Sequence, residues 1–341
     1  MYREEVRMKP LSLNDIVRIG KLWLQSGGNS NIEIGALEPL LWADGSYRID
    51  DMVKALVDLG FKVSMTTNGQ LLHKYAKSLS QAGLGLIRTS WHSTNPVMFK
   101  EIAGGYGDYW KFIAGITEAS ELGIKVDFNR VLLKGFTSDI SEQLSFLNTY
   151  KCRLKLFTLL WTPESDESYK SQYQDWRPVV KSEILPSTVS IQRVKKDIGR
   201  KRLQFHLQGG GLVEVKLGDK LDRSMQPCNS CKHQLVCEEK FGDYVRVDPS
   251  LNMYFCYLRR DIGFSVSNYL DENTGFKKTL QGSIGEIDSN EMISKTSIRL
   301  TVVQFCNFNS RKPGQTHGWC MEEPGEYRYP PIKPTLIQLK R

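Results

Sequence analysis

The sequence predicts an α/β fold, a partial TIM-like (β/α) barrel, from a pattern that repeats through residues 1–160. In each repeat a helix ends at a glycine, a run of apolar and β-branched residues follows, and that run ends in polar side chains. Strands that alternate with helices form a parallel sheet with right-handed crossovers. A smaller C-terminal region is set apart by a cluster of cysteines.

The predicted helices of the barrel are each followed by a predicted strand. Ser12 is placed to cap the first helix, which ends at Gly27, and the next helices end at Gly60, Gly83 and Gly123. Beyond the barrel, residues 161–220 are predicted to form a linker and a hairpin around a glycine triplet. The predicted strands of the barrel are residues 31–34, 62–66, 86–89, 125–131 and 154–159.

Polar residues follow each of these strands. In barrels of this type the active site is built at the rim formed by the carboxyl ends of the strands, so polar residues there predict a binding site. Any single one could simply begin a turn, but five strand ends with the same pattern favour a site. The rim residues are Glu38, Thr67, Asn68, Ser90, His92, Asn129 and Thr158.

Four of the seven cysteines lie in one 29-residue window: Cys228, Cys231, Cys237 and Cys256. Two cysteines separated by two residues can bind one metal centre, and residues 244–258 are predicted to form a hairpin that returns Cys256 toward them. Four thiolates suit zinc and an iron–sulfur cluster equally well. Inert thiols or two disulfides are the weaker alternatives, because the clustering is so uneven.

Length and composition indicate a globular, cytoplasmic protein. The chain has 341 residues and no run of 18 apolar residues, and its first residues are charged, unlike a signal peptide. In the cytosol the cysteines are expected to stay reduced. The net charge of +8 comes from 46 basic and 38 acidic residues spread along the chain, which suits an anionic substrate. Nucleic acid is not expected, since no basic stripe is present.

Several short motifs, taken in order, resemble the radical S-adenosylmethionine superfamily, and among its branches the molybdenum-cofactor GTP 3',8-cyclase. The resemblance covers residues 8–160 and extends to the cysteine window. It implies a partial barrel in which a four-iron four-sulfur cluster binds S-adenosylmethionine and a 5'-deoxyadenosyl radical abstracts hydrogen from the substrate. The motifs are residues 35–41, 66–69, 90–93, 99–102 and 129–135.

The resemblance also implies roles for individual residues. Glu38 would hold the methionine amine, Ser90 would contact the sugar or carboxylate of S-adenosylmethionine, and Asn129 would support it. Thr67, with Asn68 beside it, would lie toward the substrate. The four cysteines would ligate an auxiliary four-iron four-sulfur cluster, so residues 221–341 are expected to form an auxiliary domain with a C-terminal tail. A reducing partner and a small-molecule or peptide substrate would complete the system.

The chain departs from the family pattern at its start. The C-x3-C-x2-C loop that binds the radical cluster follows the first strand in this family, and it is absent before Cys152. We therefore expect a barrel that lacks its first strand, with an unpaired edge, either because the protein begins upstream or because this is a truncated copy. The usual Gly-Gly-Glu-Pro motif reads Ala36-Leu37-Glu38-Pro39.

The features that bind GTP do not carry over. An arginine of the cyclase aligns with Glu33 and a lysine with Asp127, and two acids in these places would repel a triphosphate. Four cysteines could close the shell of an auxiliary cluster that has three in the cyclase, and the chain lacks the terminal Gly-Gly. A substrate other than GTP is therefore expected.

Three alternatives remain open. The first is a non-catalytic iron–sulfur or zinc protein derived from this family, the second is GTP 3',8-cyclase-like activity, and the third is a zinc ribbon that binds nucleic acid. A second metal site at Cys306, His317 and Cys320 would also be chemically reasonable, although no recognised motif supports it.

Overall fold

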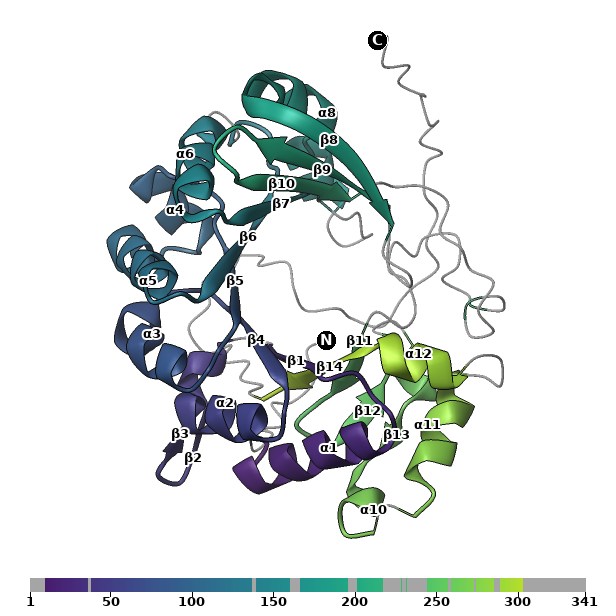
Figure 1. Ribbon diagram of the computed structural model, residues 1–341. Coiled ribbons are helices and arrows are strands. Elements are labelled where there is room, and N and C mark those ends of the chain that lie inside the picture. The colour runs from purple at the N-terminus through teal and green to yellow at the C-terminus, as the bar shows by residue number, and fades with distance from the viewer. Residues whose placement is uncertain are drawn as a thin grey trace.

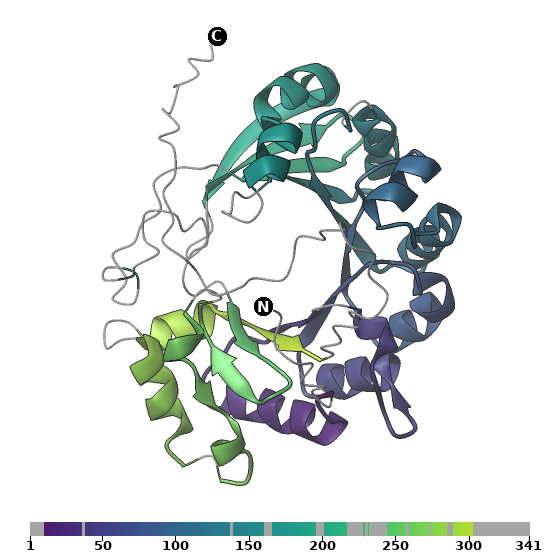
Figure 2. The ribbon, with the colours of Figure 1, turned by 180° about the vertical axis from the view of Figure 1, so that it is seen from behind.

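A continuous twelve-stranded sheet organises the molecule (Figure 1). The computed structural model describes residues 10–35, 38–136, 139–159, 166–195, 201–216, 228, 231, 244–256, 259–272, 274–284 and 289–302. The strand order is β13-β12-β11-β14-β1-β4-β5-β6-β7-β10-β9-β8. The sheet curves strongly, and helices cover its outer face in both views (Figures 1 and 2), so the predicted partial α/β barrel is confirmed.

The first half of the chain alternates strands and helices as predicted. Ser12 caps α1 through its side chain, which accepts a hydrogen bond from the Asp15 amide. A short two-stranded ribbon, β2 (Ala43–Asp44) and β3 (Tyr47–Arg48), follows the 3-10 helix η1 (Pro39–Leu41). The larger elements are α1 (Leu13–Gln25), β1 (Asn31–Gly35), α2 (Ile49–Asp58), β4 (Lys62–Thr67), α3 (Leu72–Gln81), β5 (Leu86–Ser90), α4 (Pro96–Ile102), α5 (Tyr109–Glu121), β6 (Lys125–Val131), α6 (Ile140–Tyr150) and β7 (Arg153–Phe157).

The second half extends the sheet at both ends. Beside β7 lies β10 (Leu212–Lys216), which pairs antiparallel with β9 (Lys201–Leu207), and β9 pairs with β8 (Thr188–Lys195). The other end contains β11 (Tyr244–Val247), β12 (Asn252–Tyr254), β13 (Phe264–Ser265) and β14 (Ser297–Thr301). The remaining helical segments are α7 (Asp166–Gln172), α8 (Trp176–Val179), η3 (Val180–Ile184), η4 (Leu185–Ser187), η5 (Arg260–Ile262), α10 (Ser267–Leu270), α11 (Phe276–Ile284) and α12 (Ser289–Lys295).

Both predicted hairpins are present. Phe205 pairs with Val213 in the β9–β10 hairpin, and Val247 pairs with Met253 in the β11–β12 hairpin. The turn between β11 and β12 is closed by a hydrogen bond from the Leu251 amide to the Asp248 carbonyl at 2.9 Å. The strands of the predicted C-terminal domain thus continue the barrel sheet, while the domain boundaries and the iron–sulfur character of that region stay predictions.

The expected unpaired edge at β1 does not exist, and that prediction was wrong. Parallel to β1, and on the side away from β4, lies β14, with Ile32 opposite Ile298 and Gly35 opposite Thr301. The reason is that a strand from the far end of the sequence, rich in β-branched and apolar residues, satisfies the open backbone groups of β1.

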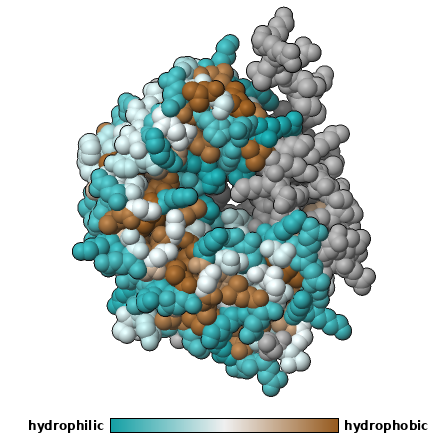
Figure 3. Space-filling view, in the orientation of Figure 1, coloured by the Kyte–Doolittle hydropathy of each residue, from teal (hydrophilic) through white to brown (hydrophobic). Residues whose placement is uncertain are grey.

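One hydrophobic core lies between the sheet and its outer helices. Trp23, Phe112 and Phe128 are fully buried in it, together with apolar residues from nearly every strand. On the face shown in Figure 3, apolar patches are interrupted by hydrophilic side chains. Within the described residues, no helix has both the length and the apolarity needed to cross a membrane. The cytoplasmic location stays a prediction.

Candidate active site

Glu38 is held rigidly just beyond the carboxyl end of β1. Its side chain is 7% exposed. One carboxylate oxygen accepts hydrogen bonds from the Thr67 hydroxyl at 2.7 Å and the Leu40 amide at 3.1 Å, and the other accepts from the Asn68 amide at 2.8 Å. Burial raises the pKa of Glu38 even though these three bonds favour the charged form. The second oxygen accepts only one of these bonds, so it has a lone pair that can accept from a further donor such as an ammonium group.

The turn after β4 positions those donors. The Thr67 hydroxyl is buried, donates to Glu38 and accepts from the Gly69 amide at 3.1 Å. Gly69 has φ +78, and a Cβ there would lie 2.7 Å from the ring of Phe112, so this turn requires glycine. Thr67 therefore acts on Glu38 directly, and its predicted place toward a substrate is untested.

Ser90 and Asn129 are paired in the register of the sheet. They lie opposite each other at the carboxyl ends of β5 and β6. Ser90 is exposed and Asn129 is half-buried. The Asn129 carbonyl accepts a hydrogen bond from the Trp91 amide at 3.0 Å, which fixes the backbone at this part of the rim. Their contacts with S-adenosylmethionine stay predictions.

The inner face of the sheet carries charged side chains. Along β5, β6 and β7, residues such as Ile87, Phe128 and Leu154 are buried in the core under the helices, and the alternate positions point to the other face. We use the name interior ladder for eight charged residues of that face that interact with one another. Among the described residues they are five cations and three carboxylates: Arg88, Arg153, Lys155, Arg202 and Arg299 with Glu33, Asp127 and Glu214.

Glu33 anchors one end of the interior ladder. It is 2% exposed and lies 2.8 Å from Arg299 Nη2 and 3.0 Å from Arg88 Nη1. Thr66 donates a hydrogen bond of 2.8 Å to the same carboxylate. Burial alone would raise the pKa of Glu33, but Arg299 and Arg88 outweigh it and lower the pKa to about 2.

The other end joins four strands. Asp127 on β6 pairs with Arg153 on β7, which lies 3.6 Å from Glu214 on β10. Glu214 in turn pairs with Arg202 on β9 at 2.5 Å and accepts from Gln204 at 3.0 Å. Burial opposes ionisation of Glu214, yet Arg202 and its other partners keep its pKa below the ordinary value.

These pairs correct one sequence-based argument. Glu33 and Asp127 were expected to repel an anionic substrate, but each is neutralised by arginines. Repulsion by two bare acids therefore gives no ground against a triphosphate.

Lys155 is the ladder cation without an ion pair to another described residue. It lies on β7 between Asn129 of β6 and Glu214 of β10. Burial, followed by the charges of Arg153 and Arg88, lowers the pKa of Lys155 to about 7. A lysine poised near neutrality can bind an anion or transfer a proton.

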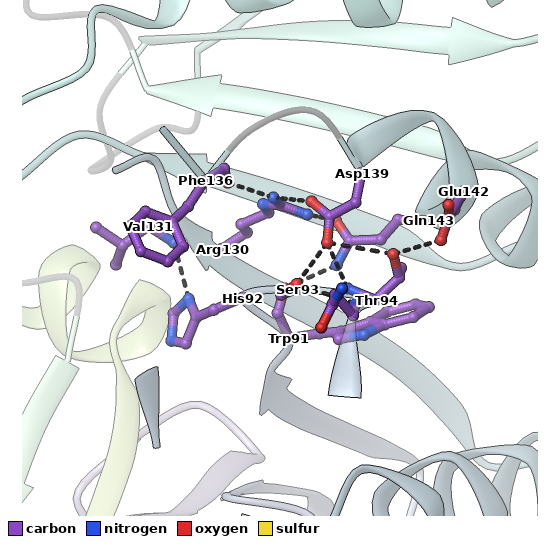
Figure 4. A network of polar contacts seen from close by, with 11 residues as sticks. Trp91, His92, Ser93, Thr94, Arg130, Val131, Phe136, Asp139, Glu142 and Gln143 are labelled. Carbon is purple, nitrogen blue, oxygen red and sulfur yellow. Dashed lines mark hydrogen bonds and ion pairs between the residues drawn. The ribbon is translucent and has the colours of Figure 1, made fainter. Parts of the chain in front are cut away.

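Behind the rim, a buried arginine ties the β5 and β6 loops to α6 (Figure 4). Arg130 is 0% exposed and donates to Gln143 at 2.8 Å and to the Phe136 carbonyl at 2.6 Å, and it forms an ion pair with Asp139. The second oxygen of Asp139 accepts from the Ser93 hydroxyl at 2.6 Å. Arg130 thus holds the loop that follows Ser90.

His92 lies on the same loop and is neutral. Its Nδ1 accepts a hydrogen bond from the Val131 amide at 3.2 Å (Figure 4). Burial, with the nearby charge of Arg130, lowers its pKa to about 4. The imidazole therefore carries its proton on Nε2 at neutral pH.

Three of the four predicted metal ligands, Cys228, Cys231 and Cys256, are among the described residues. Cys228 and Cys231 form the expected turn, closed by a hydrogen bond from the Cys231 amide to the Cys228 carbonyl at 3.3 Å. Cys228, Cys231 and Cys256 are half-buried, and Arg259 contacts the Cys231 sulfur. Within the described part of the chain, no three His, Cys, Asp or Glu side chains are gathered tightly enough to hold a metal ion.

Some predictions fall outside the described residues. These are Cys237, the Ala36-Leu37 pair before Glu38, and Cys306, His317 and Cys320. The four-cysteine site therefore stays a prediction.

The curved parallel sheet, with polar groups at its carboxyl-end rim, defines a partial (β/α) barrel with a site at its mouth. Residues 1–146 match the model of the Radical SAM superfamily. Over these residues the chain is similar to the radical S-adenosylmethionine superfamily.

Relatives with the name "Probable GTP 3',8-cyclase" are similar over more of the chain. The protein from Methanothermobacter thermautotrophicus is 26% identical over 250 residues, which are 72% of this chain and 74% of that protein. The one from Methanosarcina mazei is 38% identical over 212 residues, 61% of this chain and 59% of that protein. The alignment thus spans less than two thirds of the second relative.

Among solved structures, Streptococcus suis SuiB bound to S-adenosylmethionine aligns over 46% of this chain and 36% of that one, with 21% identity and a TM-score of 0.38. This similarity is too low to support an argument about the site.

Proposed function

We propose that this chain is a radical S-adenosylmethionine enzyme or an inactive copy of such an enzyme. The substrate would be an anionic small molecule or a peptide. Bound S-adenosylmethionine and a reduced iron–sulfur cluster, supplied with electrons by a partner, would provide the radical chemistry. The observation that carries the proposal is the position of Glu38 within a barrel whose sequence matches the superfamily.

Glu38 would hold the methionine ammonium group. Its carboxylate is fixed by three donors at the rim, and its burial makes a charged partner favourable. Ser90 and Asn129 lie on β5 and β6, along the same rim, where they would hold the ligand's sugar or carboxylate.

Glu38→Gln is expected to weaken S-adenosylmethionine binding about tenfold or more, because a charge-assisted hydrogen bond is worth about 1.5–3 kcal/mol. Equilibrium dialysis with chain purified and reconstituted without oxygen measures this. Glu101→Gln, which changes an exposed residue of α4, is the matched control and should bind like the wild type. Equal affinity of Glu38→Gln and wild type, with both folded by circular dichroism, would contradict the assignment.

The interior ladder suits an anionic substrate. Its cations outnumber its carboxylates. Lys155 lies opposite Asn129 on the adjacent strand and forms no ion pair with a carboxylate among the described residues. A phosphate or carboxylate beside Lys155 would favour the charged ammonium and offset its burial.

Lys155→Met is expected to stabilise the free protein. The folded pKa of about 7 lies below the ordinary 10.5, so the cost of charging Lys155 is fully present below pH 7 and vanishes above about pH 10.5. Allowing for partial exposure, the gain is about 1–3 kcal/mol at pH 6 and close to zero at pH 10.5. Urea unfolding at both pH values measures it, with exposed Lys62→Met as control. An equal effect of Lys155→Met at both pH values would refute this.

GTP 3',8-cyclase-like activity is the second candidate. The pairing of Glu33 and Asp127 with arginines favours it, because the interior ladder is not acidic overall. The remaining ground for a different substrate is the fourth cysteine, which would close the auxiliary shell. Consumption of GTP by the reconstituted chain, with S-adenosylmethionine and dithionite, would decide for the second candidate.

The non-catalytic alternatives make different predictions. About four irons per chain that disappear in the Cys228→Ala, Cys231→Ala variant support an auxiliary cluster. About one zinc and no iron would instead support a structural or nucleic-acid-binding protein.

A further inference from the structure

Lys155 ends a row of three polar side chains inside the barrel. Ser90 of β5 lies opposite Asn129 of β6, and Asn129 lies opposite Lys155 of β7, on neighbouring strands of the sheet (Figure 1). Ser90 is exposed, and the other two are half-buried. None of these three side chains forms a hydrogen bond or an ion pair with another described residue. The row therefore offers a hydroxyl, an amide and an amine to a ligand.

The carboxylates near Lys155 are bound to other cations. Glu214 lies opposite Lys155 on β10, but it pairs with Arg202 at 2.5 Å. Asp127, on β6, pairs with Arg153. Burial, together with the positive charge of Arg153, lowers the pKa of Lys155 to about 7, so about half of the chains carry the uncharged amine at neutral pH. An uncharged amine is a nucleophile, whereas an ammonium group is not.

Arg88 adds free donors to the same interior face. It precedes Ser90 by two positions on β5. Its Nη1 donates to the Ser64 hydroxyl at 3.1 Å and lies 3.0 Å from Glu33. The Nε and Nη2 groups of Arg88 form no hydrogen bond with a described residue. They are available to a carboxylate, which a guanidinium group binds through two donors.

The layer above the row, toward the rim, is apolar. Val131 follows Asn129 on the same face of β6 and lies opposite Phe157 of β7. Both side chains are half-buried. A ligand held at Lys155 can therefore bury a short hydrocarbon group against them.

We propose that Lys155 forms an imine with a 2-oxo acid that carries a short apolar side chain. Such a molecule has a carbonyl carbon for the amine, a carboxylate for the surrounding arginines and a hydrocarbon group for Val131 and Phe157. The inference names the class of the anionic substrate and so rests on the proposed function. A simple anion, in contrast, would draw the proton back onto Lys155 and form no covalent bond.

The reaction needs no oxidant or reductant. The Nζ lone pair of Lys155 adds to the carbonyl carbon, and a nitrogen proton passes to the oxygen through water to give a carbinolamine. The hydroxyl group then leaves with one further proton as water. The amine, the oxo acid and one proton thus give a protonated imine and one water. Ser90 and Asn129 can donate to the carbonyl oxygen as negative charge develops on it.

Reductive trapping tests the imine directly. The full chain, without S-adenosylmethionine, is incubated at pH 7 with 2-oxobutyrate and sodium cyanoborohydride, digested with a protease that does not cleave at lysine, and analysed by mass spectrometry. The Lys155 peptide is expected to gain the mass of 2-oxobutyric acid less one oxygen atom. It should react about tenfold faster or more than the peptide with exposed Lys62, since an ordinary lysine is almost fully protonated at this pH.

A matched probe tests the recognition of the carboxylate. In 2-butanone a methyl group replaces the carboxylate, and the ketone and ethyl group remain. We expect 2-butanone to label Lys155 about tenfold more slowly, because one charge-assisted hydrogen bond is worth about 1.5–3 kcal/mol. Equal rates for the two probes would overturn the assignment to a 2-oxo acid. Labelling of Lys155 no faster than that of Lys62 would overturn the imine itself.

The outcome is separable from that of the proposed function. If Lys155 forms no adduct and Glu38→Gln still weakens S-adenosylmethionine binding, this inference alone fails. If Lys155 forms the adduct while Glu38→Gln binds S-adenosylmethionine like the wild type, the imine site stands and the proposed function fails.

Discussion

Replacing Arg130 with methionine is expected to lower the free energy of unfolding by about 3–5 kcal/mol. The guanidinium is fully buried, and its removal leaves Asp139, the Gln143 amide oxygen and the Phe136 carbonyl without their donor. Burial lowers the pKa of Arg130, but Asp139 acts against this, so the pair stays charged at neutral pH. Urea unfolding followed by circular dichroism measures the loss.

The matched control makes the same substitution at an exposed pair. Arg177 pairs with Asp175 at 2.5 Å, but its side chain is 43% exposed. Arg177→Met is therefore expected to cost less than about 1 kcal/mol. Equal losses for the two variants would show that the Arg130 network contributes no more than a surface pair.

The same network links stability to the site. Asp139, the residue just before α6, accepts hydrogen bonds from the Ser93 hydroxyl and the Thr94 amide. Both residues lie on the loop that follows Ser90, so the position of Ser90 depends on Asp139. Arg130→Met should weaken S-adenosylmethionine binding as well, by a smaller factor than Glu38→Gln, since it acts through the loop alone.

Local pattern was enough to predict most of the barrel. The helix cap at Ser12, the glycine stops and the strands β1, β4, β5, β6 and β7 follow from short-range rules, and the rim residues follow from where those strands end. Glu38 and Asn68 were singled out in this way, and the structure adds a hydrogen bond from the Asn68 amide to the Glu38 carboxylate, while their roles in binding stay predictions.

Long-range pairing could not be predicted in the same way. The pairing of β14 with β1 joins residues about 270 positions apart, and nothing in either strand alone specifies the partner. The interior ladder was not predicted for a related reason, because β5, β6 and β7 were treated as apolar strands. The available signal was a polar residue at every second position, as in Arg88 and Ser90, Asp127 and Asn129, and Arg153 and Lys155.

The charge of Glu33 can be tested through its pH dependence. The folded pKa of about 2 lies below the ordinary 4.5, so the stabilisation is complete above about pH 5 and is lost as the pH falls toward 2. The difference between the two pKa values corresponds to ~3 kcal/mol. Glu33→Gln removes the charge that Arg88 and Arg299 share, and it is expected to lower the unfolding free energy by about that amount at pH 7.

Since the wild type loses roughly half of this stabilisation by pH 3, the gap between wild type and Glu33→Gln should narrow by the same share. Urea unfolding of both proteins at pH 7, 5 and 3 measures the gap, and Glu101→Gln, at an exposed position, should track the wild type throughout. A gap that is constant with pH would mean that Glu33 acts through its shape and hydrogen bonds. In that case the ion pairs of Glu33 with Arg88 and Arg299 would not be what stabilises this end of the interior ladder.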